Sequence, residues 1–303
     1  MEREHYISKI NNIVKEYLQT PENERSLTKL ASKCGVKRQT ISKYLKEPGF
    51  DVINYQNLCK IDQTVFDSID TEEKAYWLGF LFADGNIASK EDKLEINLSS
   101  KDIDHLNKFK KFINSDAKDR ICKTKSGHEQ CRFSVRNKHL WEELNSKGCI
   151  PNKTLILKFP DEKIFKDKSL IRHFIRGYFD GDGTIGVYNG KYGTIFNIGI
   201  ASTKSFLEDV QKYIGIKGVI KNATCNTYES KVFVLHYSSL KARRVSRYLY
   251  ENCNVCLTRK YNIYEMFCRA EEESSVLKSS KIGELCDENT EVSSEITKGS
   301  ETL

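Results

Sequence analysis

Trp77-Leu-Gly-Phe-Leu-Phe-Ala-Asp84-Gly85 and Ile175-Arg-Gly-Tyr-Phe-Asp-Gly-Asp182-Gly183 are two versions of one nine-residue motif. The two aspartates are 98 residues apart, so each motif can open its own half-domain. Both versions carry small residues at the third and seventh positions: Gly79 and Ala83, then Gly177 and Gly181. Because residues four apart share one helix face, we predict two helices that pack closely through these positions.

Two such helices would bring Asp84 and Asp182 side by side at their C-terminal ends. A carboxylate there faces the negative end of the helix dipole, and two carboxylates repel each other. A divalent metal ion bound through oxygen ligands would offset both costs. The alternative is a pair of ordinary buried helices, each ending in a glycine cap, but that does not explain the aspartate before each glycine.

At these residues the chain resembles the LAGLIDADG homing endonuclease family, from about residue 72 to about residue 268. The resemblance implies a site-specific DNA endonuclease in which Asp84 and Asp182 hold Mg²⁺ (or Mn²⁺), and each half contributes to cutting one strand. Such a metal can activate water, stabilise charge on the phosphate and assist the leaving 3′ oxygen. Backbone carbonyls near Ala83 and Gly181 are expected to supply further oxygen ligands.

A second recurring phrase, apolar-x-x-Lys, ends both repeats: Ile150-Pro-Asn-Lys153 and Leu257-Thr-Arg-Lys260. The resemblance implies that Lys153 and Lys260 are catalytic and polarise the nucleophilic water or the phosphate. Arg259 competes with Lys260 for this role, and plain surface lysines are the alternative. The motifs differ where Asp180 replaces Phe82, and we expect Asp180 to face away from the metal and to be peripheral.

Hydrophobic periodicity gives the same element order twice, helix–strand–strand–helix–strand–strand–helix. We therefore predict an α+β fold with two pseudo-symmetric αββαββα repeats, packed through the motif helices and bearing a saddle of antiparallel strands. A small all-α domain precedes them. The expected segments are a helix-turn-helix DNA-binding domain at 1–50, a linker at 51–71, repeats at 72–170 and 171–270, and an acidic, disordered tail at 271–303.

The N-terminal segment indicates three short helices, of which the second and third are joined by a turn. Ser26 is a suitable N-cap, Ala31 permits close approach, and Gly35 suits a left-handed turn residue. In a DNA-binding helix-turn-helix the second helix meets the major groove, whereas a plain helical hairpin is the alternative. The residues expected to face DNA are Lys37, Arg38, Gln39, Thr40, Ser42 and Lys43.

The polar strand faces predict a second DNA-contacting surface. Arg and Lys suit guanine edges and phosphates, and Asn and Gln suit adenine. An ordinary solvated sheet face is the alternative. The candidates are Lys123, Lys125, Gln130, Arg132, Ser134 and Arg136 in the first repeat, and Lys191, Tyr192, Asn197, Lys221, Asn222, Asn226 and Lys231 in the second.

Composition agrees with a polyanionic partner. The net charge is +7, but residues 271–303 hold nine acidic and three basic side chains, which leaves +13 on residues 1–270. Ten cysteines without a signal segment predict free thiols in a reducing compartment, and Cys253 and Cys256 are interpreted as buried apolar residues rather than zinc ligands. No apolar run is long enough to cross a membrane.

We therefore expect a cytoplasmic monomer that binds double-stranded DNA and associates with the nucleoid, an organelle not being excluded. The alternatives are a transcription regulator that uses the same scaffold without cleavage, and an RNA-splicing maturase. Retention of both aspartates favours cleavage over regulation, and a helix-turn-helix favours duplex DNA over RNA. A free-standing or intron-encoded gene, with a role in intron homing, is the expected origin.

Overall fold

The computed structural model describes residues 17, 19–21, 26–44, 60–88, 92–118, 120–124, 126–190, 193–223 and 232–269. The predicted tail at 271–303 and residues 51–59 of the expected linker lie outside these ranges, as do residues 1–16 and 45–50 of the expected helix-turn-helix domain. None of the helices in the described ranges is both long and apolar enough to span a membrane.

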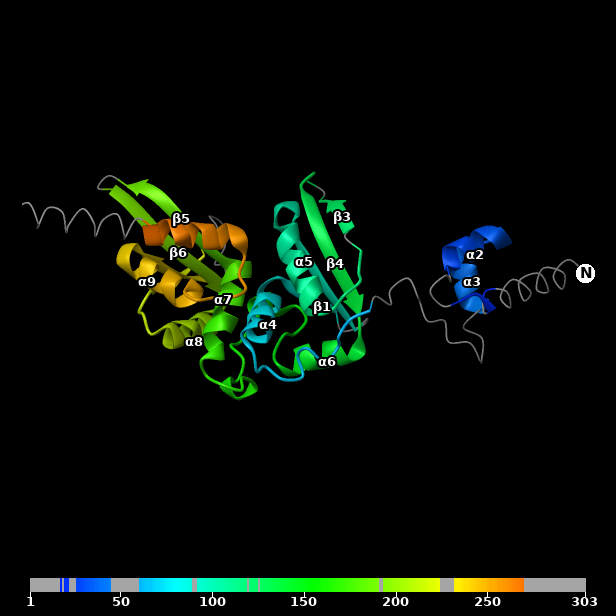
Figure 1. Cartoon of the computed structure of the whole chain (residues 1–303), viewed down its shortest axis with the longest axis horizontal. Coiled ribbons are helices and arrows are strands. Elements are labelled where there is room, and N and C mark those ends of the chain that lie inside the picture. Colours follow the sequence, from blue (N-terminus) through cyan, green and yellow to red (C-terminus); the bar gives the residue numbers. More distant parts are fainter. Residues whose placement is uncertain are drawn as a thin grey trace, which may run out of the picture.

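The two repeats have the predicted element order (Figure 1). The first contains α4 (Glu72–Asp84), β1 (Gly85–Ala88), β2 (Lys93–Ser99), η3 (Ser100–Asp102), α5 (Ile103–Phe112), β3 (Arg120–Lys123), β4 (Glu129–Arg136) and α6 (Lys138–Ser146). The second contains α7 (Leu170–Asp182), β5 (Gly183–Gly190), β6 (Gly193–Ser202), α8 (Lys204–Ile214), β7 (Val219–Asn222), β8 (Phe233–Ser238) and α9 (Ser239–Tyr250). Two short 3₁₀ turns, η4 (Lys153–Leu155) and η5 (Glu162–Ile164), lie between the repeats, and residues 258–269 are helical.

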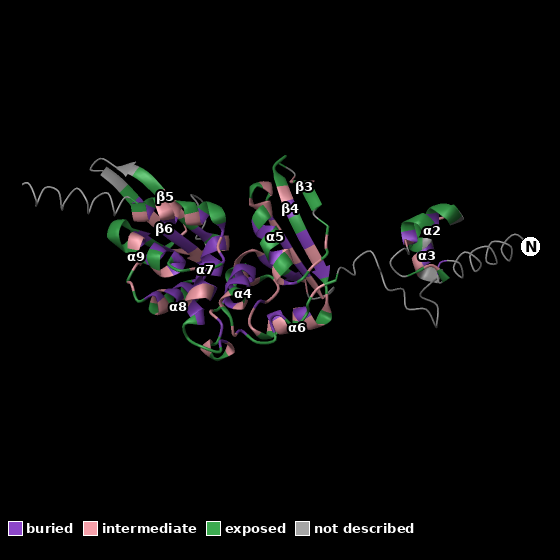
Figure 2. Cartoon of the chain, in the orientation of Figure 1, coloured by how far each residue is buried: buried purple, intermediate pink, exposed green. Residues whose placement is uncertain are grey.

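Each repeat folds one four-stranded antiparallel sheet, in the order β1-β2-β4-β3 and β5-β6-β8-β7. Alternating side chains bury one face of each sheet against the helices, as with Ile96 of β2 and Phe133 of β4, which are directly paired. This alternation is visible along the strands in Figure 2. The predicted α+β class and the order of elements are confirmed.

The motif helices α4 and α7 meet at the centre of the molecule (Figure 1) through their glycines. A Cβ atom added to Gly79 would lie 1.9 Å from the backbone oxygen of Phe174, and one added to Gly177 would lie 1.9 Å from that of Tyr76. Only glycine fits such a contact, because the backbones themselves touch. The predicted close approach therefore determines how the two halves are joined.

The linker prediction for 51–71 needs correction in its described part, residues 60–71. Phe66 is fully buried, Ile69 is 1% exposed and forms a parallel bridge with Phe165, and Val65 is also buried. The backbone amide of Asp62 donates to the carbonyl of Ile113 at 2.7 Å. Burial of these apolar side chains makes the segment part of the first repeat's core.

The N-terminal region contains α2 (Leu27–Cys34) and α3 (Arg38–Tyr44). The hydroxyl of Ser26 accepts from the amide of Lys29, and Gly35 has a positive φ of 68°. The amide of Gly35 also bonds back to the last turn of α2, and Ala31 and Ile41 are buried. The local geometry is that of two helices joined by a tight turn, and DNA binding by this unit stays a prediction.

Candidate active site and DNA-facing surface

The two motif aspartates end α4 and α7 at neighbouring positions. A Cβ atom on Gly181 would lie 3.2 Å from the carboxylate oxygen Oδ2 of Asp84, so the helix ends touch where the acids emerge. Burial, and then the charge of Asp182, raise the pKa of Asp84 to about 6. Within the described residues, neither carboxylate forms an ion pair. The site therefore concentrates negative charge and hard oxygen atoms.

Asp182 has a different environment from Asp84, although both end a motif helix. Its side chain reaches solvent, yet partial burial raises its pKa above the ordinary value. The Tyr178 hydroxyl and the charges of Lys153 and Lys260 oppose that rise in pKa. Phe80 occupies the position of Tyr178 in the first motif and has no hydroxyl to offer Asp84.

Lys153 and Lys260 occupy equivalent places. The ammonium of Lys153 donates to the carbonyl of Gly85, the residue after the first aspartate. The ammonium of Lys260 donates to the carbonyl of Gly183, the residue after the second aspartate. Both lysines therefore reach the strand that leaves a motif helix, as the internal repeat requires. Lys260 is only 2% exposed, and burial lowers its pKa to about 8.

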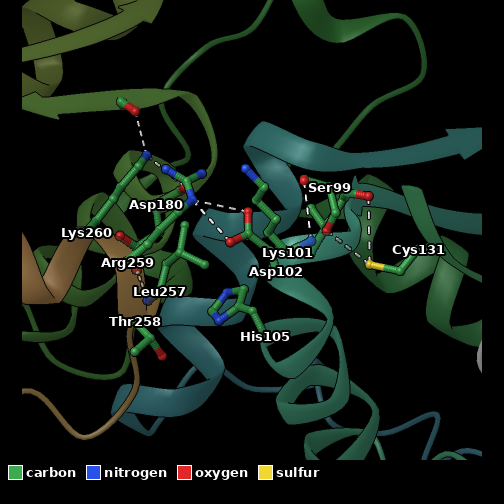
Figure 3. A network of polar contacts seen from close by, with 12 residues as sticks. Ser99, Lys101, Asp102, His105, Cys131, Asp180, Leu257, Thr258, Arg259 and Lys260 are labelled. Atoms are coloured by element: carbon green, nitrogen blue, oxygen red, sulfur yellow. Dashed lines mark hydrogen bonds and ion pairs between the residues drawn. The ribbon is translucent and has the colours of Figure 1, made fainter. Parts of the chain in front are cut away.

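Arg259 points elsewhere. Its guanidinium Nε donates to both oxygens of Asp102 in the first repeat, at 3.1 and 3.2 Å (Figure 3). The basic group at the helix end in the second repeat is therefore Lys260, and its catalytic role stays a prediction.

Lys153 and Asp182 line one cavity of about 170 Å³, although they come from different repeats. Three residues that carry hydroxyl groups, Thr154, Tyr178 and Ser202, also line this cavity. The Tyr178 hydroxyl contacts the Oγ atom of Ser202 at 2.8 Å. Sequence reasoning missed these hydroxyl residues, and the one available signal was the replacement of Phe80 by Tyr178 between the motifs.

The exposed sheet face of the first repeat is polar. Asn97 of β2 is directly paired with Arg132 of β4, and Arg132 donates through Nε to the Asn97 side chain at 2.7 Å. Asn97 and the exposed Asn86 of β1 were not predicted as DNA contacts. Gln130, Arg132, Ser134 and Arg136 share the register of this face, because the residues between them are buried.

Two predicted contacts have the wrong strand phase. Lys123 pairs with Glu129 and Asn222 pairs with Phe233, so both take the register of the buried face at the edge of their sheets. Arg120, which pairs with Arg132, is exposed on the polar face instead. A shift of one residue moves a side chain to the opposite face of a sheet, and this explains the error.

The remaining predicted DNA contacts lie on the second sheet, on the N-terminal helices, or outside the described residues. Asn197 pairs with Ser238, and Lys221 pairs with Val234, both in the register of the polar face. Lys37, Arg38 and Gln39 are exposed, and Ser42 is half-buried. Outside the described residues or side chains lie Thr40, Lys43, Lys125, Lys191, Tyr192, Asn226 and Lys231.

The cysteine pair at the end of α9 does not form a zinc centre with other described residues. Cys253 and Cys256 are half-buried rather than buried, and both thiols are free. The two thiols are hydrogen-bonded to each other, which lowers the pKa of Cys253.

Fold and site together define a protein of two α+β repeats with one acidic helix end and one lysine from each. The family model of the LAGLIDADG-like domain matches residues 169–250, which run from the start of α7 to the end of α9. The second repeat is therefore a LAGLIDADG-like domain, and the first repeat has the same motif and topology. No curated protein matches the chain.

Several solved structures are similar at low identity. The homing endonuclease I-LtrWI bound to target DNA is 14% identical, with a TM-score of 0.43 over 67% of this chain and 92% of that chain. I-GzeII in complex with its DNA target is 13% identical, with a TM-score of 0.42 over 70% and 96%. I-SmaMI bound to cleaved DNA is 13% identical, with a TM-score of 0.42 over 70% and 94%.

Proposed function

We propose that this protein is a metal-dependent endonuclease that cuts both strands of duplex DNA at specific sites. The observation that carries the proposal is the repeated pair of groups at the helix ends. Asp84 and Asp182 meet there, and Lys153 and Lys260 each bind the carbonyl of the glycine that follows one of them. Two such sets fit a reaction performed once on each strand.

The aspartates fit a divalent cation. Their carboxylates are partly desolvated, mutually repelling and placed at the negative ends of two helix dipoles, and Asp84 is fully ionised only well above pH 6. Asp84 and Asp182 would hold the metal, with backbone oxygens near Ala83 and Gly181 as further ligands. The bound cation would supply positive charge against the charge that develops on the phosphate.

The lysines would stabilise the negative charge that develops on the phosphate. With a pKa of about 8, Lys260 is mostly protonated at neutral pH. Its three N–H donors bind the carbonyls of Phe179, Asp180 and Gly183, so it would act through its positive charge at the helix end. Lys153, beside the cavity that Asp182 lines, is suited to the same task. The two polar sheet faces would hold the duplex across the site by phosphate and base-edge contacts.

The test is to incubate the purified protein with Mg²⁺ and a random-site duplex library and to sequence the cut ends. We expect one enriched site, and no cutting after chelation of the metal. Binding of one enriched site without any cut ends would instead identify a DNA-binding regulator.

We expect Asp84→Asn or Asp182→Asn to abolish double-strand cleavage at that site while largely preserving affinity. Each change removes one charge partner of the metal but little contact area. Asp104→Asn, an exposed carboxylate on α5, is the matched control. Cleavage at the wild-type rate by either motif variant would show that the aspartates are not the metal ligands.

A further inference from the structure

Asp180 is the most deeply buried carboxylate beside the site. It is 1% exposed, and three donors satisfy its two oxygens. The Tyr250 hydroxyl donates to Oδ1 at 2.6 Å, and the Tyr76 hydroxyl and the backbone amide of Leu257 donate to Oδ2, both at 2.7 Å. These partners come from α9, from the first repeat and from the segment that ends at Lys260. Asp180 faces away from the metal site, as expected, but it is central rather than peripheral.

A short path of hydrogen bonds joins Asp180 to Lys260 (Figure 3). Asp180 holds the amide of Leu257, and the carbonyl of Leu257 accepts from the amide of Lys260 at 3.0 Å. This turn, residues 257–260, directs the Lys260 ammonium back to the motif helix. There it donates to the carbonyls of Phe179 and Asp180, at 2.6 and 2.9 Å. The side chain of Asp180 therefore fixes the start of the turn that carries the lysine.

Arg176, one helical turn before Asp180, secures the preceding residues of the same segment. Its fully buried guanidinium donates to the carbonyl of Val255 at 3.0 Å and pairs with Glu72 at 2.7 Å. Glu72 in turn accepts from the amide of Asn254 at 2.7 Å. Two charged residues of α7 and one of α4 thus hold residues 254–257.

Among its described residues, the first repeat has no equivalent of this network. Leu78 and Phe82 stand where Arg176 and Asp180 stand in the second motif. The segment leading to Lys153 makes two other contacts with the first motif helix. Gly148 lies close to the ring of Phe82, and the thiol of Cys149 donates to the carbonyl of Leu81. Apolar packing and one thiol hydrogen bond therefore support Lys153, whereas buried charged groups support Lys260.

We propose that Asp180 is a positioning residue for Lys260 alone, so that one strand cut depends on Asp180 and the other does not. The inference rests on the proposed endonuclease function. Its physical basis is that a displacement of about 1 Å in a catalytic group can cost on the order of a hundredfold in rate.

The decisive variant is Asp180→Asn, which keeps the shape of the side chain but leaves fewer acceptors for its three donors. The substrate is a supercoiled plasmid that carries the site recovered from the library, with each strand labelled separately. We expect Asp180→Asn to slow the strand that Lys260→Met slows, by about tenfold or more, and to leave the other within about threefold. The double variant should be no slower than Lys260→Met alone, because the two residues act through one group.

Tyr250→Phe is the milder variant, since it removes one donor to Asp180 and leaves the carboxylate in place. We expect the same strand preference from it, at a smaller size of about threefold. Tyr237→Phe is the matched control, because it also removes a buried tyrosine hydroxyl from the second repeat, one bonded to Ile216. Equal slowing of both strands, or additive effects in the double variant, would overturn the proposal.

A measurement without DNA separates this inference from the proposed function. Hydrogen exchange should become at least tenfold faster at the amides of residues 255–260 in Asp180→Asn, and stay unchanged at residues 149–155. If the wild-type protein cuts no DNA, the proposed function fails, and this exchange pattern still decides whether Asp180 holds the lysine segment. Unchanged exchange at residues 255–260 would refute that role.

Discussion

At the scale of single residues, His105 is a buried base that the fold keeps neutral. It is 2% exposed, among the rings of Trp77 and Phe80, and its pKa is lowered to about 3, first by burial and then by the charge of Lys108. The Tyr76 hydroxyl gives its single proton to Asp180, so the Nε2 atom of His105 must be the donor in its 3.1 Å contact with Tyr76. His105 is thus linked to the Asp180 network in its neutral form.

This histidine predicts acid sensitivity. Its pKa is depressed in the folded state, so below the unfolded value of about 6.5 the unfolded chain binds a proton that the folded chain does not. The contribution of neutral His105 to the unfolding free energy is fully present above that pH, and it is lost as the pH falls towards 3. Between pH 7 and pH 5 we expect about 2 kcal/mol of the unfolding free energy to disappear.

Denaturant unfolding at several pH values, in wild type and His105→Gln, checks this prediction. The glutamine amide can still donate to Tyr76 but does not titrate. The variant should therefore lose less stability than wild type over the same pH range. Parallel curves for the two proteins would mean that His105 is not the group responsible.

The two lysines give a second prediction at this scale. If Lys153 and Lys260 are equivalent, Lys153→Met should slow one strand cut more than the other, and Lys260→Met should reverse that preference. The loss is expected to be on the order of a hundredfold, while the aliphatic stem and the fold are retained. Strand-specific nicking of the plasmid measures it. If both variants keep both strand rates within a few-fold of wild type, the lysines have no catalytic role.

At the scale of elements, the contact between α4 and α7 tolerates no added atom. We expect Gly79→Ala or Gly177→Ala to lower the unfolding free energy by about 3 kcal/mol or more, because the new methyl group would collide with a backbone carbonyl. Gly186→Ala is the matched control, since a Cβ there meets only the movable side chain of Tyr188 at about 3 Å. Equal losses for interface and control variants would contradict this account.

The elements also show how far sequence reasoning reaches. The helix ends and both lysines were located correctly, because each is a local pattern that occurs twice. Asp180 was misjudged, since its partners Tyr76, Leu257 and Tyr250 lie 104, 77 and 70 residues away in the chain. The sheet face predicted for Lys123 and for Asn222 is wrong, because both lie on short strands with few buried residues to fix the register.

At the scale of the whole molecule, the predicted N-terminal DNA-binding unit should add affinity rather than chemistry. Deleting residues 1–50 should weaken binding to the recovered site and reduce its salt dependence, because phosphate contacts and their counterion release are lost. Cleavage at high protein concentration should persist, since only a tethering advantage disappears. Lys37→Ala with Arg38→Ala in the full chain should change binding in the same direction. Unchanged affinity at several salt concentrations would show that the unit makes no contact with DNA.

The pairing of α7 with α4 has a consequence for how the halves can be combined. Arg176 and Asp180 find Glu72 and Tyr76 only on the opposite helix. Two copies of the second repeat, facing each other, would place Leu170 and Phe174 where Glu72 and Tyr76 stand. Each buried Arg176 would lose its carboxylate partner, at a cost of several kcal/mol. The halves are therefore a matched pair that has lost interchangeability. A symmetric molecule could not be made by doubling the second repeat, unless Arg176 were replaced at the same time.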